Sequence, residues 1–102
     1  MKENTRDIDV SLLVLDDDAP VHAYADEMFA NNKPLGVIST RYSAVVPFMI
    51  GNRGRTVALI ADVDDPNQLA EAIAIVERRL GHVTSLIRHR TDLPPSSAPT
   101  AA

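Results

Sequence analysis

The sequence contains no cysteine, so disulfides and metal sites built on thiolates are excluded. Only 4% of the residues are aromatic, whereas 45% are hydrophobic, which predicts a core of aliphatic side chains. No hydrophobic run approaches the roughly 20 residues that a membrane-spanning helix needs. The charged start of the chain, residues 1–7, does not resemble the apolar part of a signal peptide. We therefore expect a cytoplasmic protein that makes no membrane contact.

An excess of basic residues is also missing, because the formal net charge is −4 at pH 7. This charge argues against direct binding to nucleic acid, which depends on a basic surface. The sequence has no glycine-rich phosphate motif and no histidine pair at metal-ligand spacing. No Ser–His–Asp arrangement can be argued from the order of residues. We therefore do not expect an enzyme in the ordinary sense.

The length of 102 residues allows one domain. We expect a flexible N-terminus over residues 1–7 and a single α/β domain over residues 8–92. Residues 93–102 are rich in Pro, Ser and Ala, which is typical of a tail or linker.

Hydrophobic patterning predicts four strands and at least two helices. The predicted strands are Ile8–Leu15, Leu35–Thr40, Thr56–Ala61 and Val83–Arg90. Between the first two strands, apolar residues recur with the period of an amphipathic helix: Val21, Tyr24, Ala25, Met28 and Phe29. The helix before the last strand has a similar stripe: Leu69, Ala72, Ile73, Val76 and Leu80.

One segment, Tyr42–Ile50, is compatible with either a helix or a strand. If it is helical, the chain forms a parallel doubly wound sheet. If it is extended, it forms a hairpin with Thr56–Asp62, and the fold is a ferredoxin-like α+β sandwich. The propensities of this segment leave both folds open.

Aspartates follow two of the predicted strands directly. We expect the strands that end near Leu15 and Ala61 to be central and to lie side by side in either fold. Their carboxyl ends would then bring Asp16, Asp17 and Asp62 to one edge of the sheet. Carboxylates that close together either take up protons or hold a cation, and Mg²⁺ is the natural partner.

Helix capping accounts for two further aspartates. Asp18 precedes Ala19-Pro20 and Asp65 precedes Pro66, at the predicted starts of the two helices. Asp is a favoured N-cap residue and Pro is common in the first turn. We expect Asp18 and Asp65 to cap these helices.

The aspartate motifs resemble those of the receiver domains of two-component response regulators. The first motif is an apolar strand that ends in an acidic group, Leu12-Leu13-Val14-Leu15-Asp16-Asp17-Asp18, and the second is Ile60-Ala61-Asp62-Val63-Asp64-Asp65-Pro66. The resemblance implies that Asp62 accepts a phosphoryl group and that Thr91, after the last strand, senses it. It also implies that Asp16, Asp17, Asp62 and the carbonyl group of Asp64 bind Mg²⁺.

The resemblance covers residues 8–92 and departs from the family after that point. No lysine follows Lys33, so Arg88 or Arg90 is the candidate for the positive charge that a receiver's lysine supplies. The resemblance thus implies a truncated or degenerate receiver, with a histidine kinase or an output domain as partner.

The other functional class that the residues allow is a ferredoxin-like module that binds a small molecule or assembles into oligomers, similar to ACT domains. Both classes leave Val83–Arg90 at the edge of the sheet, and exposed edge strands tend to pair. We therefore expect a homo-oligomer.

Overall fold

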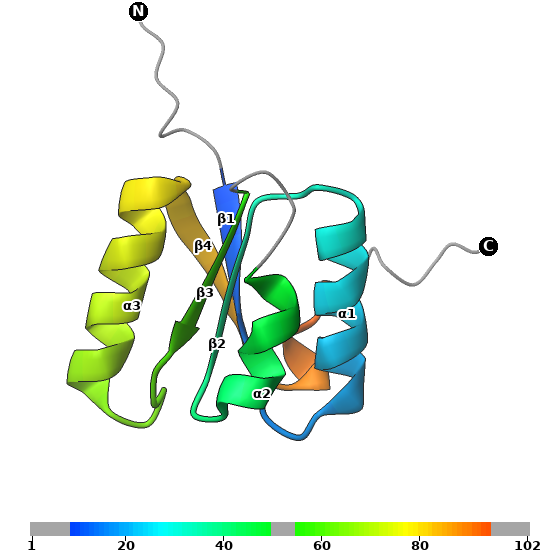
Figure 1. Cartoon of the computed structure of the whole chain (residues 1–102), viewed down its shortest axis with the longest axis horizontal. Helices are drawn as coiled ribbons and strands as arrows, with labels where there is room; N and C mark the ends of the chain where they lie inside the picture. The colour runs from blue at the N-terminus through cyan, green and yellow to red at the C-terminus, as the bar shows by residue number, and fades with distance from the viewer. Residues whose placement is uncertain (1–8, 50–54, 95–102) are drawn as a thin grey trace, which may run out of the picture.

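The computed structural model describes residues 9–49 and 55–94, which form a four-stranded parallel sheet with helices on both faces (Figure 1). The strands are β1 (Asp9–Val14), β2 (Leu35–Ser39), β3 (Thr56–Ile60) and β4 (His82–Ile87). The helices are α1 (Ala19–Ala30), α2 (Tyr42–Val45) and α3 (Pro66–Arg79), with short 3-10 turns at η2 (Val46–Phe48) and η4 (Arg90–Asp92). The predicted flexible start and residues 95–102 of the predicted tail lie outside the described residues.

The predicted α/β class, a parallel sheet flanked by helices, is confirmed. The ambiguous segment Tyr42–Ile50 is helical over residues 42–48, and each strand pair in the described residues is parallel. The ferredoxin-like alternative is therefore wrong, because it requires this segment to pair as a hairpin with the next strand.

The order of the strands across the sheet is β3-β2-β1-β4, so β1 and β2 are the central strands. The prediction that β1 and β3 lie side by side is wrong, because β2 separates them. Every residue of β2 is buried, whereas Ile60 at the end of β3 is 51% exposed. The apolar sequence of β3 suited a central position, yet it also suits this edge because helices cover both of its faces.

This order differs from that of a receiver domain, in which the strands lie in the order 2-1-3-4-5. It matches the first four strands of the doubly wound dinucleotide-binding fold, whose order is 3-2-1-4-5-6. The direction of winding reverses between β1 and β4, because β2 and β3 lie on one side of β1 and β4 lies on the other. In open α/β sheets such a reversal marks the crevice where ligands bind.

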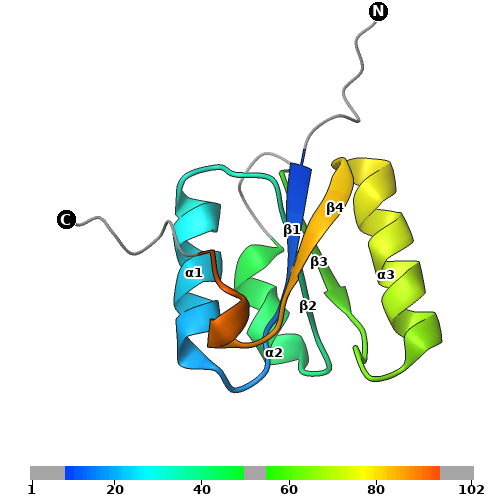
Figure 2. The ribbon, with the colours of Figure 1, turned by 180° about the vertical axis from the view of Figure 1, so that it is seen from behind.

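The core has one layer on each face of the sheet (Figures 1 and 2). Between the sheet and the pair α1 and α2 lie mostly aliphatic side chains, among them Leu13, Leu15, Val21, Ala25, Leu35, Val37 and Val45. Beneath α3 lie Val10, Leu12, Val14, Ile38, Val57, Ala72 and Val76. Both predicted helix stripes are confirmed, since their members are buried or pack against these two layers.

The second layer contains one tight contact between a strand and a helix. A Cβ atom at Gly36 of β2 would lie 3.0 Å from Leu12 Cδ1 and 3.1 Å from Val76 Cγ2. Because glycine has no side chain, α3 packs directly against the backbone of the central strand at this point.

Candidate functional site at the carboxyl edge of the sheet

Charged loops meet where the four parallel strands end. Asp16–Asp18 follow β1, Arg41 follows β2, Asp62–Asp65 follow β3 and Arg88–Arg90 follow β4. Parallel strands end at a common edge, so the topology alone brings these four loops to one end of the sheet. We call this set of loops the carboxyl edge.

Arg88 connects three of the strands at this edge. Its Nε atom donates to Asp16 Oδ2 at 3.2 Å. Its two terminal nitrogens donate to Asp64 Oδ1 and Oδ2, at 2.9 and 3.2 Å, in a bidentate pair. Paired N–H groups that face both oxygens of one carboxylate form the strongest kind of ion pair. The guanidinium group of Arg88 therefore neutralises carboxylates that follow β1 and β3.

This arrangement changes the acid–base properties of the groups involved. The hydrogen bonds from Arg88, and then its positive charge, lower the pKa of Asp64 below its ordinary value. The hydrogen bonds between Arg88 and Asp64, with a smaller contribution from Asp16, raise the pKa of Arg88. Asp64 therefore stays ionised at a lower pH than an unpaired aspartate does.

A second arginine acts on the neighbouring aspartates. One terminal nitrogen of Arg41 lies 3.1 Å from Asp17 Oδ1 and donates to the main-chain oxygen of Asp16 at 3.0 Å. The same oxygen of Asp16 lies 2.8 Å from Nε2 of His22 in α1. The loop after β1 is therefore held both by its own helix and by the loop after β2.

Asp18 occupies the N-cap position of α1, but the predicted capping bond is wrong. Its side chain accepts no hydrogen bond from the helix. Its Oδ2 atom instead accepts the main-chain N–H of Arg90 at 3.0 Å, and Oδ1 lies 3.5 Å from Arg90 Nε. Oδ1 is buried without a hydrogen-bond partner among the described residues. Asp18 thus joins the loop after β4 to the loop after β1.

The prediction for Asp65 is confirmed. Its Oδ1 atom accepts the main-chain N–H of Asn67 at 3.0 Å, which caps the first turn of α3. Its Oδ2 atom accepts from the side chain of Gln68 at 3.2 Å.

Asp62, the predicted phosphoacceptor, is half-buried and bonded within its own turn. Its Oδ1 atom accepts the N–H of Asp64 at 2.9 Å, and its own N–H donates to Gln68 Oε1 at 2.9 Å. Thr91, the predicted sensor, lies exposed in η4, and its side chain forms no hydrogen bond to any described residue. The roles of these two residues stay predictions.

The predicted Mg²⁺ ligands are distributed over this network. Arg88 brings Asp16 and Asp64 together, Asp17 points to Arg41, and Asp62 stays in its turn. Within residues 9–49 and 55–94, no group of three or more His, Asp or Glu side chains has an arrangement that could hold a metal ion. Magnesium binding by Asp16, Asp17, Asp62 and Asp64 remains a prediction.

A shallow crevice of about 350 Å³ lies at the reversal point between β1 and β4. It is lined by the two charged loops, Asp16–Asp18 and Arg88–Arg90. Asp92 fixes the second loop, because its Oδ2 atom accepts the N–H groups of Arg88 and His89 at 3.2 and 3.0 Å. Both bonds lower the pKa of Asp92, and the bond from His89 has the larger effect. The crevice therefore has fixed walls with charges of both signs.

Two contributors were absent from the predicted site, Arg41 and His22. Arg41 was detectable in principle, because it follows β2 in the same way as the aspartates follow β1. His22 contacts a main-chain oxygen, and no side-chain pattern in the sequence signals that contact.

No family model matches the sequence, and none of the curated proteins compared with it matches significantly. In the described part of the chain, no helix has the length and hydrophobicity needed to cross a membrane.

Proposed function

We propose that the chain is a regulatory domain that acts through protein–protein contacts at the carboxyl edge of its sheet. The observation that carries the proposal is the exposed pair of consecutive residues Arg41 and Tyr42, of which Arg41 forms an ion pair with Asp17 in the lining of the crevice. The side chain of Arg41 is 55% exposed, and Tyr42 is 64% exposed. Tyrosine and arginine are the residue types, with tryptophan, that contribute most often to the energy of protein interfaces.

The place of this group in the fold supports the proposal. Open α/β sheets bind their ligands outside the carboxyl ends of the strands, at the point where the winding reverses. In a dinucleotide-binding domain the loop after β1 is rich in glycine and approaches a pyrophosphate closely. Here that loop is Asp16-Asp17-Asp18, which has no glycine, so side chains occupy the space that close approach of a pyrophosphate requires. A protein surface fits this edge better than a nucleotide does.

The ion pairs at the edge favour a partner that carries both signs of charge. Asp17 is 91% exposed while it pairs with Arg41, and exposed pairs of this kind exchange partners at little cost in free energy. A charged residue of a partner protein can form an ion pair with either Asp17 or Arg41 in place of the pair between them. Charge complementarity of this type sets specificity and association rate more than affinity.

Site-specific photo-crosslinking tests the proposal in cells that produce the protein. A photoreactive phenylalanine analogue replaces Tyr42 in one variant and Ala30 in the other, because Ala30 is an exposed residue at the end of α1 that lies away from the carboxyl edge. We expect a discrete crosslinked protein with the analogue at position 42 and none at position 30. Adding Asp17→Lys and Arg41→Glu together to the first variant should remove the crosslink. An equal pattern from both positions, or a crosslink that survives the charge changes, would contradict the proposal.

A further inference from the structure

The outward surface of α3 is covered by no other described element. Four exposed residues follow one another along it at spacings of four, three and four: Asn67, Glu71, Ala74 and Arg78. This spacing places them on one stripe of the helix, as at the contact positions of a helix pair. Ala74, at the middle, has the smallest side chain of the four, which allows another helix to approach closely.

The sheet face beneath α3 is covered only in part. Among the described elements, the helices α1 and α2 lie on the opposite face, and α3 is the one helix on this face (Figure 1). A helix is about 10 Å wide, and four strands at about 4.8 Å spacing are wider than that. Leu86 of the edge strand β4 is in register with Leu12 beneath α3, yet it stays 42% exposed.

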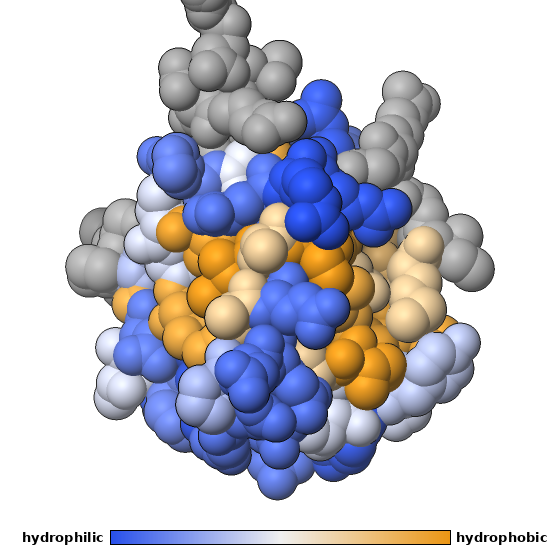
Figure 3. Space-filling model, turned by 90° about the vertical axis from the view of Figure 1, so that its left-hand side faces the viewer, coloured by the Kyte–Doolittle hydropathy of each residue, from blue (hydrophilic) through white to orange (hydrophobic). Residues whose placement is uncertain are grey.

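Hydrophobic surface therefore remains beside the helix. Figure 3 shows it across the middle of this face, with hydrophilic residues at both ends. A depression of about 230 Å³ lies between α3 and β3, lined in part by Leu59, Ala72 and Ile75. A second, of about 410 Å³, lies between the end of α3 and β4 and includes Ala74 and Arg78 in its lining. The stripe thus runs between two open depressions.

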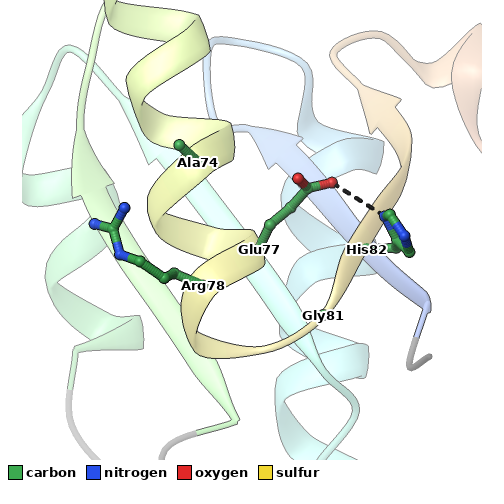
Figure 4. Close-up of a pocket in the computed structure, with 5 residues that line it drawn as sticks. All are labelled: Ala74, Glu77, Arg78, Gly81 and His82. Atoms are coloured by element: carbon green, nitrogen blue, oxygen red, sulfur yellow. Dashed lines mark ion pairs between the residues drawn. The ribbon is translucent and has the colours of Figure 1, made fainter. Parts of the chain in front are cut away.

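The charges along the stripe are complementary to those of a second, antiparallel copy of the same stripe. Glu71 and Arg78 lie at equal distances along the helix on either side of the midpoint between Ala74 and Ile75. An antiparallel copy of α3, centred on that midpoint, places each Glu71 opposite the other copy's Arg78 and each Ala74 opposite the other copy's Ile75. Glu71 and Arg78 have no ion-pair or hydrogen-bond partner for their side chains among the described residues. In Figure 4 the guanidinium group of Arg78 extends away from Glu77, which instead reaches His82, 3.5 Å away.

We propose that α3 is a self-association surface whose occupant is α3 of a second copy of this chain, packed antiparallel about a two-fold axis. The paired helices would bury the stripe, with Glu71–Arg78 ion pairs formed twice. This inference does not rest on the proposed function, because the carboxyl edge and the stripe are separate surfaces.

The edge strand β4 is a poorer surface for self-association than α3. Glu77 Oε2 accepts the N–H of Val83 at 3.0 Å, and Asp92 accepts the N–H groups just after the strand. The bond from Val83 is the main reason why the pKa of Glu77 is lowered. A side chain that occupies a main-chain donor of an edge strand removes one position at which another strand could pair.

Sedimentation of four proteins tests the proposal: the unchanged chain, Glu71→Arg, Arg78→Glu and the double variant Glu71→Arg/Arg78→Glu. We expect a dimer for the unchanged chain and for the double variant. Each single variant opposes like charges twice in the dimer and should associate at least roughly tenfold more weakly. An equimolar mixture of the two single variants should dimerise again, because both ion pairs can form between unlike copies. Glu27→Arg, an exposed glutamate of α1, is the matched control and should leave the dimer unchanged.

Two results would overturn the proposal. One is an unchanged chain that remains a strict monomer at about 1 mM, where even an association of about −4 kcal/mol is visible. The other is a dimer whose stability is the same in both single variants, since that dimer would use another surface.

Discussion

Arg88, which follows β4, binds Asp64, which follows β3, although two strands lie between β3 and β4 in the sheet. The same guanidinium group also holds Asp16 after β1, so one side chain connects three strand ends. An acidic edge of this kind was expected to attract a metal ion. In the structure an arginine from the last strand supplies the positive charge.

The bond between Arg88 and Asp64 makes stability depend on pH. The folded-state pKa of Asp64 is lowered by Arg88, so the carboxylate contributes stability above its unfolded pKa, near pH 4. This contribution is lost as the pH falls through the lower, folded-state pKa. Urea unfolding between pH 7 and pH 2 should therefore show a smaller loss of stability for Asp64→Asn than for the unchanged chain.

Asp17→Asn is the matched control for this experiment, because Asp17 pairs with Arg41 while almost fully exposed. We expect its stability to follow that of the unchanged chain closely. Parallel curves for Asp64→Asn and the unchanged chain would show that the bond to Arg88 is not formed in solution.

A methyl group at Gly36 tests the contact between β2 and α3. The added Cβ would lie 3.0 to 3.2 Å from side-chain atoms of Leu12 and Val76. These neighbours are fully buried and have little room to move, so Gly36→Ala should lower the free energy of unfolding by about 1–3 kcal/mol. Chemical denaturation provides the measurement.

A second substitution shows whether crowding is the cause. Val76→Ala removes two of the three atoms that the new methyl group meets. The double variant should therefore lose less stability than the sum of the two single losses. Strict additivity would mean that the cost of Gly36→Ala arises elsewhere.

The two aspartates that begin the helices should respond differently to alanine. Asp65→Ala removes a capping bond to Asn67 and should cost about 1 kcal/mol of stability, with earlier amide exchange in the first turn of α3. Asp18→Ala removes a bond to the N–H of Arg90, so its amide shift changes should centre on the loop after β4. Equal effects of both substitutions on their own helices would contradict this difference.

The sequence predicted the secondary structure and the buried stripes well because these depend on local periodicity. Val21, Ala25, Ala72 and Val76 recur at helical spacing, and all four are buried. The order of the strands was not predictable from composition, because an apolar strand such as Thr56–Ile60 is stable at an edge that helices cover on both faces.

Only part of the site could be predicted from the sequence. The strand ends placed Asp16, Asp17 and Asp62 at the carboxyl edge, since that follows from parallel strands alone. The partners of these residues depend on which loops become neighbours across the sheet. Arg88 is 72 residues from Asp16 and 24 from Asp64, and no local pattern links such distant positions.

A titration with Mg²⁺ and beryllofluoride, followed by amide NMR, tests most directly whether arginine rather than a metal ion neutralises this edge. If Arg88 and Arg41 hold the carboxylates, the amides of Asp16, Asp17 and Asp62 should show no saturable shift change. Saturable changes at these amides that disappear in the Asp62→Asn variant would contradict neutralisation of the edge by arginine. They would instead support phosphoryl chemistry at Asp62.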